Sequence, residues 1–175
     1  DTKWVKRTLS WVAYIAGKRE SRRLLGDYIL KQDDIDKQVF HEDATVTTTW
    51  AIDLHFPDSA NMVKFPDAPF LSSTEHIYIK PYPIPYRCLY SRNVENLFMA
   101  GRNISATHVA FGSTRLMRTT AMMGEVVGMA VSICRKHQVL PREVYWWYME
   151  ELKNLMGKGV GKPGIPNNQK YNEIG

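Results

Sequence analysis

The chain has 175 residues, of which 44% are hydrophobic and 23% are charged. This length suits one ordinary domain, and this composition is typical of a globular protein with a hydrophobic core. No run of about 18 apolar residues is present, so we expect no membrane-spanning helix. The formal net charge is +5, but the basic residues are scattered rather than gathered in one stripe, which argues against nucleic acid as a partner.

Neither the cysteines nor the histidines have the spacing of a metal or redox site. Cys88 and Cys134 stand far apart, and the five histidines form no His-x-His or His-Glu-x-x-His pattern. We therefore expect no metal centre. Two cysteines do not identify a compartment, so the sequence leaves the location of the protein open.

The first part of the chain predicts strands after one short helix. Residues 4–16 have apolar side chains at helical spacing and predict a helix that ends at Gly17. Residues 22–35 predict a strand followed by a polar turn. Residues 45–56, rich in β-branched and aromatic side chains, predict another strand, and residues 57–75 predict a loop.

The second part predicts one edge segment, one buried strand and two helices. Residues 76–90 carry three prolines, which favour an extended edge segment packed against the body rather than a central strand. The apolar run 94–101 predicts a strand buried on both faces. Residues 113–137 predict the longest helix, and residues 141–156 predict another, with Pro141 in its first turn.

The stretch "AGRNISATHVAFGSTRLMRTTAMMGE", residues 100–125, joins this strand to the long helix. The first turn of a helix has unpaired N–H groups and a partial positive charge, so it attracts anionic or partly negative oxygens. Gly101 and Gly112 permit close backbone approach. A tight connection without a ligand is the alternative. The polar residues that suit a ligand are Arg102, Asn103, Ser105, Thr107 and Arg115.

Small residues recur along the predicted long helix. Thr120 or Ala121, then Gly124 and Gly128, share one face at spacings of three to four, which predicts close packing against another element. No P-loop occurs in the 175 residues, and the pattern G-x-G-x-x-G occurs only at residues 159–164, after a predicted helix rather than after the strand that a dinucleotide-binding fingerprint requires.

The run from Ile84 to Ala130 resembles the C-terminal flavin-contacting segment of a family of FAD-dependent oxidoreductases. Residues 17–35 and 142–159 also resemble that family in order and spacing. Some relatives of this kind are labelled xanthan lyases. The resemblance implies a glutathione-reductase-type FAD fold, and hence an α/β protein, or an α+β fragment of one.

The resemblance also implies how the chain is divided. Residues 1–90 would form part of a strand-containing substrate or cap domain. Residues 91–156 would form the C-terminal part of the FAD-binding domain, with its closing strand and helices. Residues 157–175 would be a flexible tail. The chain begins in mid-pattern without methionine, so we expect a fragment that lacks the N-terminal dinucleotide-binding segment of the same protein and is inactive alone.

Two groups of FAD-binding residues follow from the resemblance. One lines the cofactor after the strand: Gly101, Arg102, Asn103, Ile104 and Ser105. The other presents the N-terminus of the long helix to the flavin pyrimidine edge: Gly112, Ser113, Thr114 and Arg115. Aligned N–H groups there would stabilise negative charge on the reduced flavin.

The substrate side is less defined. His108 is a candidate proton donor or substrate contact, or else a hydrogen-bonding group that orders the loop. We expect a small-molecule or carbohydrate-like substrate. The alternative function is a non-redox, lyase-like polysaccharide-acting or carbohydrate-binding protein. Its surface would include Tyr78, Tyr82, Tyr86 and Arg87, which packing explains equally well.

Overall fold

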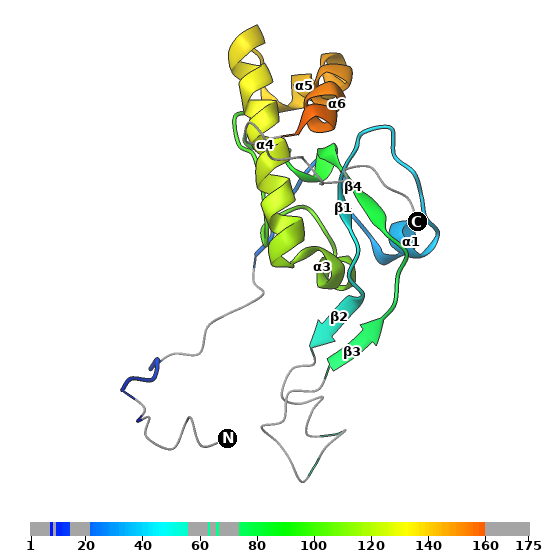
Figure 1. Ribbon diagram of the computed structural model, residues 1–175, viewed down its shortest axis with the longest axis vertical. Helices are drawn as coiled ribbons and strands as arrows, with labels where there is room; N and C mark the ends of the chain where they lie inside the picture. Colours follow the sequence, from blue (N-terminus) through cyan, green and yellow to red (C-terminus); the bar gives the residue numbers. More distant parts are fainter. Residues whose placement is uncertain are drawn as a thin grey trace.

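The computed structural model combines α-helices with two small antiparallel sheets, which confirms the predicted α/β or α+β class. In Figure 1 the long helix α4 runs beside the body, with the β2–β3 hairpin at one end and α5 and α6 at the other. None of the helices in the described part is long and apolar enough to cross a membrane. The structure describes residues 8, 10–14, 22–55, 63, 66 and 74–159.

Each sheet is a pair of strands. β1 (Ala44–Thr48) pairs with β4 (Tyr82–Pro85), and β2 (Ile52–His55) pairs with β3 (Thr74–Ile77). The single strand predicted over 45–56 is therefore two strands, which belong to different sheets. The edge character predicted for 76–90 is confirmed, because β4 carries two prolines and pairs with β1 alone.

The strand predicted over 22–35 is wrong. Its first half is extended but changes partners, since the Leu24 amide donates to the Asn103 carbonyl (3.0 Å) and the Tyr28 amide to the Arg87 carbonyl (3.3 Å). No continuous ladder forms, and Leu30 makes only an isolated bridge. Its second half is the helix α1 (Gln32–Asp36).

The buried strand predicted over 94–101 is also wrong. Tyr90 and Phe98 form an isolated antiparallel bridge, and the Met99 amide donates to the Leu89 carbonyl at 2.7 Å. Among the described residues this run pairs only with the segment just before it, so its apolar side chains are buried without a regular ladder.

The end of the long helix at residue 137 and the start of the next at residue 141 are as predicted, but other helix boundaries differ. A short 3-10 turn, η2 (Tyr86–Cys88), precedes α3 (His108–Thr114), and the long helix α4 (Met117–His137) starts four residues later than expected. The helix predicted over 141–156 is two helices, α5 (Pro141–Trp147) and α6 (Met149–Lys158), with Pro141 at the start as predicted.

Other predictions fall largely outside the described residues. Most of the helix predicted over 4–16 does so, and its described positions at 8 and 10–14 are not helical. The same holds for most of the predicted loop at 57–75. In the predicted tail, residues 157 and 158 belong to α6, and the residues from 160 onward are not described.

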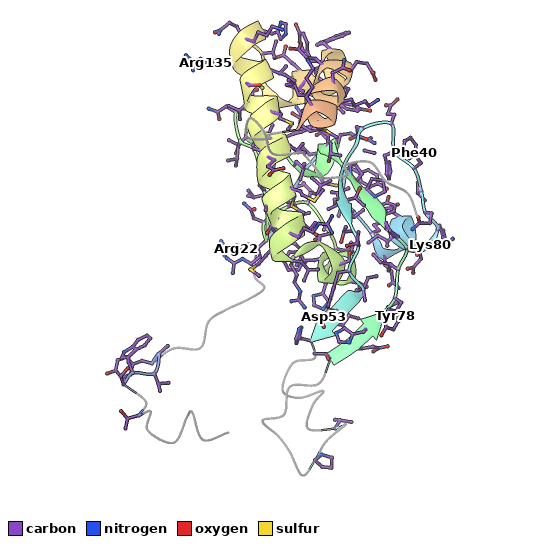
Figure 2. All side chains as sticks on the ribbon, in the orientation of Figure 1. Arg22, Phe40, Asp53, Tyr78, Lys80 and Arg135 are labelled. Atoms are coloured by element: carbon purple, nitrogen blue, oxygen red, sulfur yellow. The ribbon has the colours of Figure 1, made fainter. Side chains whose placement is uncertain are left out.

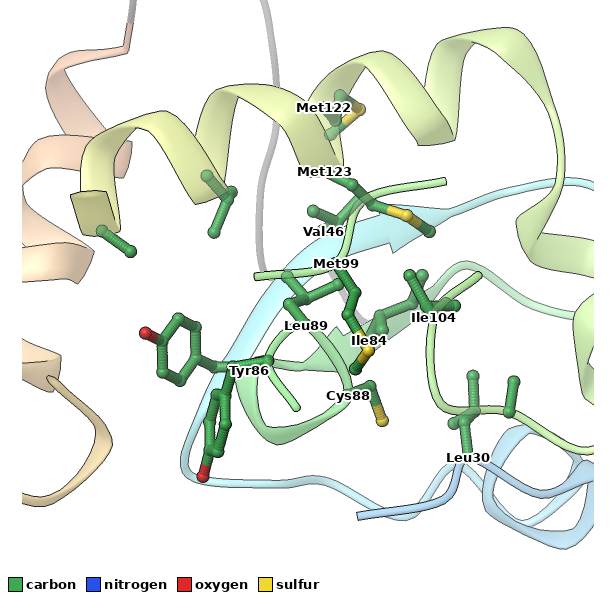
Figure 3. Packing of buried hydrophobic residues seen from close by; sticks show 14 of the residues in the cluster. Leu30, Val46, Ile84, Tyr86, Cys88, Leu89, Met99, Ile104, Met122 and Met123 are labelled. Carbon is green, nitrogen blue, oxygen red and sulfur yellow. The ribbon is translucent and has the colours of Figure 1, made fainter. Parts of the chain in front are cut away.

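One hydrophobic core joins the extended segment at residues 22–30, the β1–β4 sheet and α4. Figure 3 shows Leu30, Val46, Ile84, Ile104 and Met123 packed between these elements, and all five are fully buried. Residues on both sides of position 90 contribute to this core. The domain boundary at 90 stays a prediction.

The small-residue face of α4 does not pack as predicted. Gly124 and Gly128 are exposed, and a Cβ added at either position would meet nothing within 4 Å in the described structure. The buried stripe of α4 instead carries larger side chains such as Met122, Met123 and Val126.

Candidate functional site

The loop after residue 100 is held by backbone hydrogen bonds on two sides. The Leu30 amide donates to the Ser105 carbonyl at 3.0 Å, and the Thr107 amide returns a bond to the Leu30 carbonyl at 2.8 Å. On the other side, the Ser105 amide donates to the Cys88 carbonyl at 3.1 Å. The predicted cofactor loop is therefore a fixed scaffold between two extended segments.

Gly101 opens this loop in a conformation that requires glycine. Its φ of 99° lies in the region that residues with a Cβ rarely adopt. Its amide donates to the Met123 sulfur of α4 at 3.2 Å, which ties the loop to the long helix. Glycine at this position is thus explained by the chain path alone.

Ser105 carries an unpaired polar atom. The residue is 2% exposed, and its Oγ has no hydrogen-bond partner in the described structure. A buried hydroxyl without a partner is costly, and such a group is usually satisfied by water or a ligand. Ser105 lines a hollow of about 220 Å³ whose other walls are Arg23, Leu24, Leu25, Ile29 and Ala106.

The other predicted residues of this loop differ in their exposure. Arg102 is exposed and Asn103 is half-buried. Ile104 is fully buried, and its side chain packs in the core (Figure 3). A ligand at this loop would therefore meet the backbone of Ile104 rather than its side chain.

The prediction placed the second group in the first turn of the long helix. The structure does not place it there. Gly112, Ser113 and Thr114 are buried in the last turn of α3. A Cβ on Gly112 would lie 2.9 Å from the Asp53 carbonyl oxygen, so glycine here lets α3 pack on β2. The sequence analysis did not predict the break between α3 and α4, because it assigned residues 113–137 to a single helix.

The hydroxyls of this group bond within α3. Ser113 Oγ donates to the Ala110 carbonyl at 3.0 Å, and Thr114 Oγ1 donates to the Phe111 carbonyl at 3.3 Å. The first turn of α4 follows instead at Met117, which is 90% exposed, and no side chain caps this helix end. Cofactor contacts by residues 112–115 stay a prediction.

Arg115 connects α3 to the β2–β3 hairpin. Its Nη2 donates to the Asp53 carbonyl oxygen at 2.7 Å and lies 3.6 Å from the Asp53 carboxylate. The side chain of Arg115 is only 14% exposed. His108, the candidate proton donor, is exposed at the first position of α3.

The hairpin brings together a cluster that the sequence analysis missed. His55 Nε2 lies 3.1 Å from Asp53 Oδ2, and His76 Nε2 lies 3.2 Å from Asp53 Oδ1. Asp53 and His55 are two positions apart on β2 and therefore lie on the same face of the strand, and His76 is directly opposite Asp53 on β3. The spacing of Asp53 and His55 was visible in the sequence, but the strand pairing that places His76 beside Asp53 was not.

Among the described residues, no group of three or more His, Cys, Asp or Glu side chains is arranged to hold a metal ion. Figure 2 shows Asp53 and Tyr78 at the hairpin end of the molecule. A hollow of about 320 Å³ adjoins the cluster and is lined by Thr49, Trp50, Ala51, His76 and Tyr78.

The candidate carbohydrate surface is not assembled as proposed. Tyr82 and Tyr86 are buried, and their hydroxyls donate to the Val39 and Pro141 carbonyls, both at 2.8 Å. Arg87 makes a two-pronged ion pair with the fully buried Asp43, at 2.9 and 3.0 Å. Tyr82, Tyr86 and Arg87 are thus packing residues, and only Tyr78 is open to a ligand.

Comparison with known proteins identifies one family. The family described as FAD-dependent oxidoreductase matches residues 2–156. No curated protein and no solved structure matches the chain.

Proposed function

This chain belongs to the FAD-dependent oxidoreductase family, and we propose that its 101–107 loop binds the ribityl and flavin end of FAD. When bound, FAD supplies two-electron oxidation and reduction. The residues of this chain would hold and orient the cofactor in the manner of the glutathione-reductase-type FAD fold. Ser105 carries the proposal, because its buried Oγ has no partner in the described protein.

The proposed FAD site fits the chemistry of the loop. The ribityl chain of FAD carries hydroxyls, which both donate and accept hydrogen bonds, so one of them can satisfy Ser105 Oγ. The 220 Å³ hollow beside Ser105 is lined mostly by apolar side chains, with Arg23 at its wall. Few polar groups in an otherwise apolar lining are typical of cofactor sites.

The start of α4 supports the flavin end of the site. Its first-turn N–H groups have no capping side chain, and Met117 at this end is exposed. Such groups stabilise partial negative charge on an oxygen or nitrogen placed before them. We propose that they, rather than the buried residues 112–114, meet the flavin pyrimidine edge.

The remainder of the FAD site would come from another segment of the same protein. The G-x-G-x-x-G pattern of the sequence, at residues 159–164, follows the helix α6 rather than a strand, so it lacks the context of the fingerprint that holds a pyrophosphate. The open face of α4 at Gly124 and Gly128 supports this arrangement, because small exposed residues at helical spacing allow another element to approach closely.

We propose a carbohydrate-like alcohol as the substrate. The hollow beside the hairpin offers the Trp50 indole and the exposed Tyr78 phenol to the C–H face of a sugar ring. Thr49 and His76 offer hydrogen bonds to its hydroxyls. Among the described residues, no acidic side chain and no lysine or arginine lines this hollow, which favours a neutral ligand.

The absorption spectrum of the purified intact protein tests the function. We expect the visible bands of oxidised flavin, either as purified or after FAD is added. Anaerobic addition of a panel of sugars and polyols should bleach these bands with at least one compound. A protein that stays colourless with added FAD and still binds sugars would instead favour the non-redox alternative.

The variant Ser105→Ala tests the proposed contact. We expect FAD affinity to fall by about 0.5 to 1.5 kcal/mol, roughly two- to tenfold, because one hydrogen bond is lost. The FAD-free protein should be no less stable, because the unpaired hydroxyl is removed. Fluorescence titration with FAD and urea denaturation measure the two effects.

The control variant is Ser132→Ala on α4. Its Oγ donates to the Met129 carbonyl in its own helix, and the residue is exposed. FAD affinity should be unchanged in this variant. Equal FAD affinity in Ser105→Ala and the wild type would contradict the contact without contradicting the family assignment.

A further inference from the structure

The β2–β3 hairpin has two different faces. Ile52 of β2 is fully buried, and a Cβ on Gly112 would come within 3.0 Å of it, so this face holds the hairpin against α3. Asp53, His55 and His76 are on the other face. The side chains of His55 and His76 are therefore not on the face that packs against α3, whereas Asp53 is linked to this part of the molecule through Arg115.

The Asp53 carboxylate is the centre of this cluster. Its side chain is 19% exposed and is surrounded by His55 at 3.1 Å, His76 at 3.2 Å and the Arg115 guanidinium at 3.6 Å. These are the titratable or charged groups that the described structure places against it. A structural ion pair requires one cationic partner, whereas the Asp53 carboxylate has three groups that can carry a positive charge around it.

The two carboxylate oxygens differ. Asp53 Oδ2 interacts with His55 and is close to Arg115, whereas the buried Oδ1 has no hydrogen bond of good geometry in the described protein. His76 Nε2 is within ion-pair distance of Oδ1 but is poorly aligned with it. Hydrogen bonds of this kind are often long or misaligned at catalytic sites without substrate and tighten when substrate binds.

His76 connects the carboxylate to the hollow. Its side chain is 47% exposed and lines the 320 Å³ hollow beside Trp50 and Tyr78. A neutral imidazole that donates from Nε2 to Asp53 has Nδ1 as its acceptor. The contact between Nε2 and Asp53 is the interaction that the described structure shows for His76, and it leaves Nδ1 able to accept a hydrogen bond from a ligand.

We propose that His76 is a proton acceptor for an alcohol bound in this hollow, and that Asp53 is its positioning residue. The inference rests on the proposed function. Oxidation of an alcohol removes a hydride, for which bound FAD would be the acceptor, and a proton, for which the protein must supply the acceptor. The O–H bond breaks, the proton bonds to His76 Nδ1, and the oxygen keeps the electron pair that becomes part of the carbonyl.

The Asp53 carboxylate serves this step in two ways. Its Oδ1 atom, 3.2 Å from His76 Nε2, favours the tautomer with the proton on Nε2, which leaves Nδ1 unprotonated. Its negative charge then stabilises the imidazolium that forms when the proton arrives. The same division of roles explains why the carboxylate is the more buried partner and the imidazole the more exposed one.

Nitrogen NMR of the intact protein, with ¹⁵N-labelled histidine side chains, tests the proposal. At a pH where His76 is neutral, we expect one fixed tautomer with the proton on Nε2. The His76→Gln variant assigns the signals. In Asp53→Asn, which keeps the size of the side chain, the fixed tautomer should be replaced by an averaged mixture of both forms.

His55→Gln is the matched control, because it removes the other imidazole and leaves Asp53 and His76 in place. The fixed His76 tautomer should persist in this variant. A wild-type His76 with its proton on Nδ1, or an averaged mixture in the wild type, would overturn the proposal even if Asp53→Asn failed to fold.

Chemical modification gives a second readout that a structural ion pair would not require. Diethyl pyrocarbonate reacts with unprotonated, accessible imidazole nitrogens, and mass spectrometry locates the product. We expect His76 to be modified, and an unreactive His76 would overturn the proposal. Neither measurement depends on flavin, so a protein that binds no FAD would refute the proposed function independently of this dyad.

Discussion

At the residue scale, the positions with the least freedom are those where two backbones meet. Gly26 lies under the Arg87 carbonyl, and a Cβ there would be 2.4 Å from that oxygen and 2.9 Å from the Ser105 Cβ. Gly26 belongs to the extended segment at residues 22–30, Arg87 to η2 and Ser105 to the 101–107 loop. A side chain at position 26 would therefore separate the elements that hold the loop.

The variant Gly26→Ala should destabilise the protein by about 1 to 3 kcal/mol, as overpacking typically does. The matched control is Gly157→Ala on α6, where the residue is exposed and the added Cβ meets nothing within 4 Å. It should stabilise the protein by up to about 1 kcal/mol, because alanine is the better helix former. Urea denaturation at neutral pH measures both, and equal effects of the two variants would contradict this account of position 26.

At the element scale, α5 is tied to the extended segment by one carboxylate. Arg142 of α5 donates to both oxygens of Asp27 at 2.6 and 2.8 Å, and Tyr90 donates to the same carboxylate at 2.8 Å. Burial raises the pKa of Asp27, but the hydrogen bonds from Arg142 and Tyr90 outweigh it. The pKa of Asp27 thus lies below its ordinary value of 3.8.

A lowered folded-state pKa means that the native protein favours ionised Asp27. Its contribution to stability is complete above the unfolded pKa and is lost as the pH falls through the folded pKa. Asp27→Asn should destabilise the protein by about 1 to 3 kcal/mol at pH 7. This difference should shrink below about pH 4 (from the ordinary carboxyl pKa), as followed by denaturant midpoints across that range.

Asp33→Asn provides the control for this pH effect. Asp33 pairs with Lys37 at 2.8 Å, but both side chains are largely exposed, at 73% and 68%. Exposed pairs contribute little to stability. A loss in Asp33→Asn as large as that in Asp27→Asn would show that the Asp27 contacts do not join α5 to the body.

At the scale of the whole molecule, a cofactor that binds only the folded state should stabilise it. FAD at about one hundred times its dissociation constant adds about 2.7 kcal/mol to the free energy of unfolding. For a chain of this size we expect Tm to rise by about 5 to 10 °C. Differential scanning calorimetry of the intact protein with and without FAD measures this shift, and AMP serves as a control that lacks the flavin end.

A smaller shift is expected in Ser105→Ala at the same FAD concentration, because this variant binds FAD more weakly. If AMP raised Tm as much as FAD does, the stabilising contacts would lie at the adenine end of the cofactor. That result would contradict the proposed role of the 101–107 loop.

The sequence by itself determined the local features. Three prolines restricted residues 76–90 to an extended edge, because proline lacks the N–H that a central strand needs. Pro141 marked the start of α5 because its missing N–H costs nothing in a first turn. The specific run from residue 100 to 125 indicated the family, which the match over residues 2–156 bears out.

Only the tertiary structure decided what depends on distant partners. The runs at 22–35 and 94–101 are apolar enough for strands, but regular strands need a continuous hydrogen-bonding partner, which the described structure does not give them. Strand register likewise placed His76 opposite Asp53, since pairing is a relation between two segments and not a property of either one. For the same reason, the sequence predicted a cofactor-binding loop at residues 101–107 but not the imidazole–carboxylate pair at the hairpin.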